Sequence, residues 1–231
     1  MSAGRVLFVG CGPGAPDLLT LRAVRALQDA DVVIWNPSLL DRDALDAHVR
    51  PDAQVVAWPP AGERDILAVY ERALADGLLV VRLKGGDPTL LGRIQPELAA
   101  VQRLGLGCEI VPGVSAHGAG AAALAVEIAT AQAPLVIADA GALPDRGAAA
   151  TCIAVYGAGR DPHALQRDLR AGGWPDLTPC VVAIELSRRG QTLVACALGD
   201  LAETLEDHAR GLMTIALVGV PCGAGPPGEK P

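Results

Sequence analysis

The sequence predicts an α/β protein of two domains with mainly parallel or mixed sheets, and three observations lead to this fold class. Short apolar segments alternate with segments of helical spacing along nearly the whole chain. Several apolar segments end in glycine-rich loops, and 231 residues exceed a typical domain of roughly 100 to 200. Because only 3% of the residues are aromatic, the cores must be built from small aliphatic side chains, which is typical of buried parallel strands.

The first half of the sequence repeats a pattern of strand, loop and helix. The predicted strands are 5–9, 31–35, 54–57, 78–83 and 108–111, and the predicted helices are 41–48, 64–75 and 94–104. We expect Asp17 to cap a further helix after the first glycine loop. Its apolar positions are Leu18, Leu21, Val24 and Leu27. This alternation favours parallel strands joined by crossover helices.

The second half of the sequence starts with an Ala-rich helix. The predicted strands are 135–138, 152–156, 181–185, 192–197 and 214–218, and the helices are 162–171 and 201–208. We place the domain boundary after residue 115, which gives domains 1–115 and 116–221, although the turn-rich segment 140–150 also looks like a break. The Gly- and Pro-rich segment 222–231 is predicted to be a flexible tail.

Composition excludes several classes of partner. The formal charge is −7 and no run of Lys or Arg occurs, which argues against nucleic acid. Six cysteines without CxxC spacing and no evident signal peptide predict a cytoplasmic protein with reduced thiols and no metal site. The longest apolar stretches are shorter than the roughly 20 residues of a membrane helix, so no membrane association is expected.

The first glycine loop, Gly10–Ala15, follows a strand and precedes a helix. It satisfies the loose dinucleotide pattern, but Pro13 and Pro16 lack the N–H groups that would bind a phosphate. No acidic residue stands at the end of the second strand, where Trp35 and Asn36 occur. These features weigh against a nicotinamide oxidoreductase. It stays an alternative, as does a loop that is purely a structural turn and binds no ligand.

Two further loops follow strands, and ligands of open parallel sheets bind at such carboxyl ends. In Lys84–Pro88 adjacent glycines let the main chain approach a ligand, while Asp87 either contacts that ligand or pins the loop. In Pro112–Ala116, Ser115 lacks the partners and the Gly-x-Ser-x-Gly context of a nucleophile. His117 is next to this motif, as a substrate contact or a helix-start residue.

Three segments in order, VLFVGCGPGAPDLLTLRAVRALQDADVV, VVRLKGGDPTLLGR and EIVPGVSA, resemble the tetrapyrrole methylase family. The resemblance extends from Arg5 to about Val220. It implies two α/β domains with a cleft between them that binds S-adenosylmethionine, a small-molecule tetrapyrrole substrate and a homodimer. The implied reaction is attack of a ring carbon on the activated methyl group, which leaves S-adenosylhomocysteine and requires no metal.

The resemblance also implies site residues. The implied cofactor contacts are Pro13, Gly85, Gly86, Asp87, Leu90, Ser115, Ala116, Tyr156, Leu186, Thr214 and Ala216. The expected cations for substrate carboxylates are Arg82, Lys84, Arg93 and Arg188. The candidates for a catalytic base are Asp87, Ser115 and His117.

Two groups within the family share features with this chain. The segments IWNPSLL and AGGWPDLTPCVVAIELS resemble precorrin-4 C-11 methyltransferases of cobalamin biosynthesis, whereas LLTLRAVRAL and RLKGGDP resemble uroporphyrinogen-III C-methyltransferases. The acid and base proposed in the second group have no counterpart at Asn36-Pro37 and Trp58-Pro59. A non-catalytic ligand-binding member and a protein-modifying relative similar to diphthine synthases therefore remain alternatives.

Overall fold

The structure, a computed structural model, describes residues 4–59, 62–144 and 152–220. The chain divides into two compact units, Met1–Ser115 and Ala116–Pro231, and each has its own sheet. The α/β fold class predicted from the sequence is confirmed, whereas the predicted tail, 222–231, lies outside the described residues. No helix in the described part of the chain is long and apolar enough to span a membrane.

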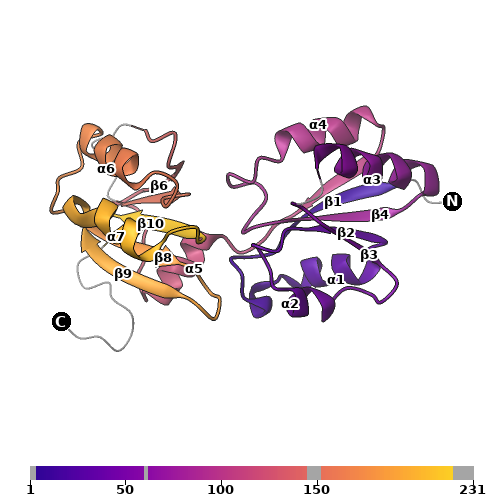
Figure 1. Ribbon diagram of the computed structural model, residues 1–231, viewed down its shortest axis with the longest axis horizontal. Coiled ribbons are helices and arrows are strands. Elements are labelled where there is room, and N and C mark those ends of the chain that lie inside the picture. Colours follow the sequence, from indigo (N-terminus) through magenta and orange to yellow (C-terminus); the bar gives the residue numbers. More distant parts are fainter. Residues whose placement is uncertain (1–3, 60–61, 145–151, 221–231) are drawn as a thin grey trace. The chain divides into compact units, whose positions relative to one another are not determined.

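The N-terminal unit is a parallel sheet covered on both faces by helices (Figure 1). The strand order is β3-β2-β4-β1-β5, and every pairing is parallel. The strands are β1 (Arg5–Gly10), β2 (Val32–Trp35), β3 (Gln54–Ala57), β4 (Leu79–Lys84) and β5 (Gly107–Val111). The helices are α1 (Leu21–Asp29), α2 (Arg42–Asp46), α3 (Glu63–Asp76) and α4 (Gln95–Arg103).

Two aliphatic cores hold these layers together. Helices α1 and α2 cover one face of the sheet, where Leu27 and Leu45 are completely buried, and α3 and α4 cover the other, where Phe8 and Val101 are buried (Figure 1). Alternate residues of each strand face opposite cores, as the pleat requires. The sheet is therefore buried on both faces, which explains its continuous apolar strands.

The start of α1 differs from the prediction. Thr20, not Asp17, is its N-cap, because the Thr20 hydroxyl accepts a hydrogen bond from the N–H of Ala23 at 3.1 Å. Asp17 and Leu18 instead lie in a short 3₁₀ turn, Pro16–Leu18, and Leu21 is 76% exposed. The predicted cap is thus wrong because the proline-initiated turn separates the glycine loop from the helix.

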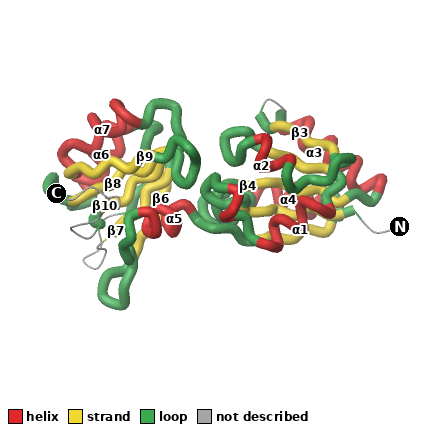
Figure 2. The backbone as a smooth tube through the Cα atoms, turned by 90° about the horizontal axis from the view of Figure 1, so that it is seen from below, coloured by secondary structure: helices red, strands yellow, loops and turns green. Residues whose placement is uncertain are grey.

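The C-terminal unit contains one sheet, whose strands are labelled in Figure 2. Its order is β6-β7-β10-β8-β9, and among the described pairings only that of β6 with β7 is parallel. The strands are β6 (Leu135–Asp139), β7 (Cys152–Tyr156), β8 (Pro179–Ile184), β9 (Thr192–Ala197) and β10 (Thr214–Val218). The helices are α5 (Ala116–Ala123), α6 (Pro162–Ala171) and α7 (Leu201–His208). Helices α6 and α7 pack with Trp174 on one face, and α5 packs on the other.

Candidate functional site

Three loops at the carboxyl ends of β1, β4 and β5 are packed backbone against backbone. The N–H of Gly86 donates to the carbonyl oxygen of Gly12 at 2.8 Å, and the N–H of Gly12 donates to that of Gly86 at 3.3 Å. A Cβ atom on Gly113 would lie 2.2 Å from the Gly86 oxygen, and one on Gly10 would lie 2.6 Å from it. No side chain fits there, so glycine is required for the three loops to meet.

Asp87 fixes the middle loop to its neighbour. Its carboxylate accepts hydrogen bonds from the N–H of Gly113 at 3.1 Å and from the N–H and hydroxyl of Thr89 at 2.8 and 2.6 Å. Burial alone would raise the pKa of Asp87, but these hydrogen bonds outweigh it and the pKa is lowered. Of the two roles predicted for Asp87, pinning the loop is the one that these contacts support.

The segment that follows Asp87 is a tight, strained turn. Leu91 and Arg93 have φ of 56° and 49°, values that non-glycine residues seldom adopt. A Cβ atom on Gly92 would lie 2.3 Å from the carbonyl oxygen of Pro88, so the turn leaves no space inside. Ile94 anchors the end of the turn in the core, while Arg93 is exposed. The turn therefore fixes the main chain from which the exposed Arg93 side chain extends beyond the end of β4.

A buried charged cluster lies below these loops and gives Arg82 and Lys84 a role that the sequence did not predict. The Nε atom of Arg82 donates to Glu97 of α4 at 2.9 Å, and the Lys84 ammonium contacts the other carboxylate oxygen. The Arg82 guanidinium also lies 4.7 Å from the ring centre of Trp58. Because Arg82 is only 3% exposed, it is poorly placed to meet a substrate carboxylate.

The pKa values of the charged cluster follow from burial and pairing. Burial would raise the pKa of Glu97, but the hydrogen bonds and charges of Arg82 and Lys84 lower it. Burial lowers the pKa of Lys84, against the opposing effect of Glu97. Tyr70 adds a hydroxyl that donates to Glu97 at 3.3 Å, and burial raises its pKa. The cluster thus contains two cations and one anion, an excess of one positive charge.

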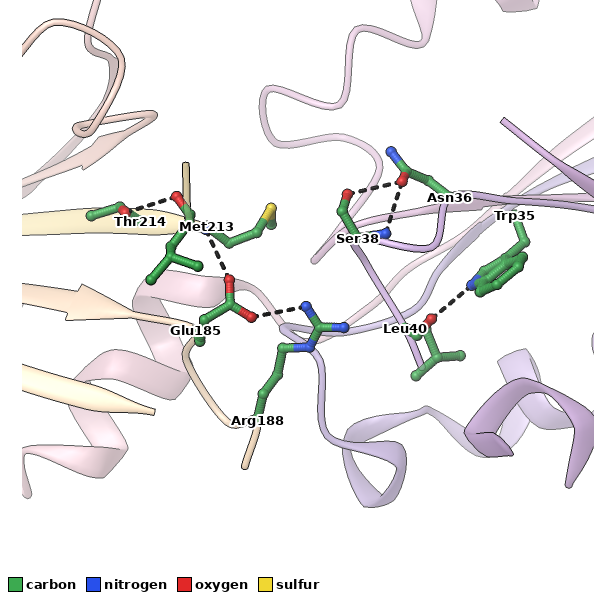
Figure 3. A network of polar contacts seen from close by, with 9 residues as sticks. Trp35, Asn36, Ser38, Leu40, Glu185, Arg188, Met213 and Thr214 are labelled. Atoms are coloured by element: carbon green, nitrogen blue, oxygen red, sulfur yellow. Dashed lines mark hydrogen bonds and ion pairs between the residues drawn. The ribbon is translucent and has the colours of Figure 1, made fainter. Parts of the chain in front are cut away.

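The loop after β2 is organised by its own side chains. The side-chain oxygen of Asn36 accepts hydrogen bonds from the N–H and hydroxyl of Ser38 at 2.9 and 2.8 Å (Figure 3). The indole N–H of Trp35 donates to the carbonyl oxygen of Leu40 at 2.8 Å. These contacts are structural, and they hold the loop IWNPSLL in place.

In the C-terminal unit, several predicted cofactor residues lie along one edge of the sheet. Because β10 runs antiparallel to β7 and β8, its first residue, Thr214, lies at the edge where β7 ends in Tyr156 and where Leu186 follows β8. Ala216, in contrast, is completely buried in the core between these strands. A side-chain contact of Ala216 with a ligand therefore does not fit its position.

His117 and Tyr156 form a pair at this edge. The His117 Nδ1 atom lies 2.9 Å from the Tyr156 hydroxyl oxygen, which also accepts the His117 backbone N–H at 3.3 Å. The two rings meet edge to face at an interplanar angle of 76°. Burial lowers the pKa of His117, so the imidazole is neutral at physiological pH.

Arg188 is paired within the C-terminal unit. Its guanidinium donates to Glu185 at 3.0 Å, and the second carboxylate oxygen of Glu185 accepts the N–H of Met213 at 2.9 Å (Figure 3). Glu185 has φ of 47°, which is unusual for a non-glycine residue, and these hydrogen bonds stabilise that backbone conformation after β8. Arg188 thus stabilises the loop after β8. Among the four predicted substrate cations, the exposed Arg93 is the most accessible to a ligand.

The sequence pattern does not predict that Glu97, Trp58 and Tyr70 belong to the charged cluster. A signal was present, because Arg82 and Lys84 alternate in an apolar strand and a buried cation needs a counterion. Elsewhere in the described residues, no group of three or more His, Cys, Asp or Glu side chains is arranged to hold a metal ion.

Comparisons with known proteins match this chain over most of its length. The family model described as Tetrapyrrole (Corrin/Porphyrin) Methylases matches residues 5–202. The precorrin-4 C(11)-methyltransferase of Mycobacterium tuberculosis is 32% identical over 228 residues, which cover 93% of this chain and 90% of that enzyme. The uroporphyrinogen-III C-methyltransferase of Paracoccus denitrificans is 45% identical over 117 residues, but only 49% of this chain and 41% of that enzyme are matched.

Solved structures agree with this likeness. A cobalt-precorrin-4 methyltransferase superposes with a TM-score of 0.81 at 26% identity, and the match covers 93% of this chain and 94% of that one. The uroporphyrin-III C-methyltransferase of Thermus thermophilus in complex with S-adenosylhomocysteine superposes with a TM-score of 0.77 at 28% identity, covering 94% of this chain and 97% of that one.

Proposed function

Because the chain belongs to the tetrapyrrole methylase family, we propose that it is an S-adenosylmethionine-dependent C-methyltransferase that acts on a tetrapyrrole. The observation that carries the proposal is the interlocked set of glycine loops at the carboxyl ends of β1, β4 and β5. Such a set presents main-chain N–H and C=O groups without intervening side chains. The preferred substrate is a precorrin-4-type intermediate of cobalamin biosynthesis, and uroporphyrinogen III is the alternative.

The residues present fit this cofactor. Pro13, Gly85, Gly86, Asp87 and Ser115 are all partly exposed at the ends of the three strands. We propose that they hold the cofactor together with Leu90 and, from the second unit, Ala116, Tyr156 and Thr214. Leu186 is 5% exposed in the core and, like Ala216, does not fit a side-chain contact. When bound, the cofactor supplies a methyl group already activated on a sulfonium, so the protein needs mainly to align the reacting atoms and exclude water.

The chain's own residues then have distinct tasks. Arg93 is positioned by its strained turn to bind a carboxylate of the substrate. Of the three candidates for a base, Asp87 is occupied by hydrogen bonds and has a lowered pKa, which makes it a weak one. His117 is neutral and oriented by Tyr156, so it is the best suited to accept the proton that the ring loses after methylation.

The choice of substrate group is supported by the extent of the likeness. The match with the M. tuberculosis enzyme covers 90% of that enzyme's length, whereas the more identical Paracoccus match covers 41% of the length of that enzyme. The cobalt-precorrin-4 methyltransferase has a TM-score of 0.81, against 0.77 for the Thermus enzyme. We propose in addition that residues 1–115 and 116–221 are the two domains of the fold. We also propose that the protein acts in the cytoplasm and that it is a homodimer.

The first test is calorimetric titration of the full chain with S-adenosylmethionine, S-adenosylhomocysteine and NAD in parallel. We expect micromolar binding of the first two, worth about 8 kcal/mol, and no comparable binding of NAD. Binding of neither would refute the proposal, and preference for NAD would favour the oxidoreductase.

The second test supplies uroporphyrinogen III or a precorrin-4 preparation together with S-adenosylmethionine and measures release of S-adenosylhomocysteine. Faster release with precorrin-4 supports the preferred substrate, and faster release with uroporphyrinogen III supports the alternative. Cofactor binding without release from either substrate would identify a non-catalytic member. Light scattering in the same buffer tests the homodimer.

A further inference from the structure

Two cysteines face each other across the strands β8 and β9 of the C-terminal unit. The strand register pairs Cys180 directly with Cys196. In the same ladder the N–H of Leu198 donates to the carbonyl oxygen of Thr178 at 2.9 Å, which marks these two residues as a hydrogen-bonded pair. Every second pair of an antiparallel ladder is of this kind, and Cys180 and Cys196 lie two positions further along, so they are also a hydrogen-bonded pair. Such a pair keeps its Cα atoms about 5.5 Å apart, within the span of about 4.4 to 6.8 Å that a disulfide requires.

The two thiols are reduced and differ in their surroundings. Both point to the face of the sheet that α6 and α7 cover. Cys180 is 1% exposed, and its sulfur lies 3.5 Å from the carbonyl oxygen of Thr178. Cys196 is only half-buried, since β9 is the edge strand of the sheet. A small oxidant can therefore reach Cys196 more easily than Cys180.

The electrostatic surroundings of the two thiols differ in the same direction. A hydrogen bond from Cys180 lowers the pKa of Cys196 to about 7, with support from Thr204 of α7 and against the effect of burial. The same bond raises the pKa of Cys180. The pKa of Cys196 is lowered and that of Cys180 is raised, so Cys196 is the more readily ionised of the two thiols, and the thiolate is the form that attacks electrophiles.

We propose that Cys196 and Cys180 form a thiol oxidation site that reacts with hydroperoxides and closes to a cross-strand disulfide. The Cys196 sulfur attacks the terminal peroxide oxygen, the O–O bond breaks, and the alcohol or water leaves with a proton. The Cys196 sulfur, oxidised by two electrons, is then a sulfenic acid. The Cys180 sulfur attacks it, the S–S bond forms, the S–O bond breaks, and water leaves with the Cys180 proton.

This site is separate from the proposed methyl transfer. Cys180 lies near the start of β8, whereas Leu186 follows the opposite end of that strand. The register already opposes the two cysteines, so closing the bridge requires no change of strand pairing. We therefore expect affinity for S-adenosylhomocysteine to be the same before and after oxidation, and the oxidation itself does not depend on the proposed function.

The test treats the native full chain with hydrogen peroxide at neutral pH, alkylates the remaining thiols and digests the protein with trypsin without reduction. Cys180 falls in the peptide 171–188 and Cys196 in the peptide 190–210. Mass spectrometry should find these two peptides linked, and dithiothreitol should separate them. Full alkylation of both thiols after peroxide treatment, a sulfinic acid on Cys196 beside a free Cys180, or a bridge to another cysteine would each overturn the proposal.

Three variants sharpen the test. Cys180→Ser should leave Cys196 as a sulfenic acid that dimedone traps, and Cys196→Ser should leave Cys180 unreacted because it is buried. Cys152→Ser is the matched control: Cys152 is 2% exposed on the opposite face of the same sheet, and burial raises its pKa to about 11. This control should form the linked peptides as the wild-type chain does, and its failure to do so would contradict the assignment to Cys180 and Cys196.

Discussion

Replacing Glu97 by Gln should destabilise the N-terminal unit far more than the loss of a surface ion pair would. Glu97 is the one anion of a cluster in which Arg82 is 3% exposed and the Lys84 side chain is 11% exposed. The substitution Glu97→Gln keeps one acceptor oxygen but leaves two buried cations without a counterion. A buried cation without a partner is costly, because the protein interior solvates charge poorly.

The magnitude follows from the burial of the three groups. Removing one partner of a fully buried pair costs about 3 to 5 kcal/mol. Here the Glu97 side chain is 25% exposed, and Lys84, whose pKa burial already lowers, can relieve part of the repulsion by releasing its proton. We therefore expect the free energy of unfolding to fall by about 2 to 3 kcal/mol at neutral pH.

Urea denaturation of the full chain measures this cost. Asp46→Asn is the control, since the Arg42–Asp46 pair is exposed to solvent and is expected to contribute little to stability. The pKa of Glu97 is lowered in the folded protein, so its stabilisation is complete above the pKa of an unfolded Glu, about 4.3, and is lost as the pH falls through the folded value. The difference between wild type and Glu97→Gln should therefore shrink in acid. A loss below about 1 kcal/mol at neutral pH would refute the reasoning.

Three further substitutions and one control, Gly105→Ala, test the loops and the His117–Tyr156 pair. Gly113→Ala should cost about 1 to 3 kcal/mol in urea denaturation and weaken S-adenosylhomocysteine binding in calorimetry, because its Cβ would lie 2.2 Å from a carbonyl oxygen. Gly105→Ala is the control: Gly105 has φ of 78° and open space around it, so this variant should lower the free energy of unfolding by about 1 to 2 kcal/mol and leave S-adenosylhomocysteine binding unchanged. Equal S-adenosylhomocysteine affinity of the two variants would contradict the proposed role of the glycine loops in cofactor binding. Asp87→Asn should weaken cofactor binding and cost about 1 kcal/mol of stability, since it removes a charged acceptor; unchanged affinity would limit Asp87 to a structural role. Tyr156→Phe should reduce turnover more than cofactor affinity because the hydroxyl orients His117, and unchanged turnover would argue against His117 as the base.

The fold class was predictable because its signals are local. Apolar segments of four to six residues with Gly or Pro within the next two positions give the strands β1 to β5 almost at their observed ends, and the same signals give the glycine loops. The start of α1 was missed because Asp17 and Thr20 are both good caps, and the 3₁₀ turn after Pro16 decides between them. The antiparallel pairings of β8, β9 and β10 depend on strand order, which a pattern of alternating segments does not specify.

The candidate site was predictable to the extent that it is built from strand ends. Gly12, Gly86 and Gly113 lie far apart in the sequence, but they follow β1, β4 and β5, which lie side by side in the order β4-β1-β5, and so they meet at one edge of the sheet. The roles of the cations were less predictable. Arg82 follows a strand pattern that does not reveal its partner, because Glu97 lies on the next helix and reaches it only in the folded unit.

The central position of β1 in the parallel sheet has a consequence for synthesis of the chain on the ribosome. β1 is made before both of its neighbours, β4 and β5, and Val9 pairs with Val111. At about 5 to 20 residues per second, roughly 5 to 20 s pass between translation of these two positions. The segment RVLFVG has two free edges until β4 is made, and one edge stays free until β5 is made. In contrast, β8 and β9 are joined by a short connection and can pair as soon as both are made. Chaperone capture of the nascent chain and the yield of soluble protein at reduced growth temperature are therefore expected to depend on the first strand more than on any strand of the second unit.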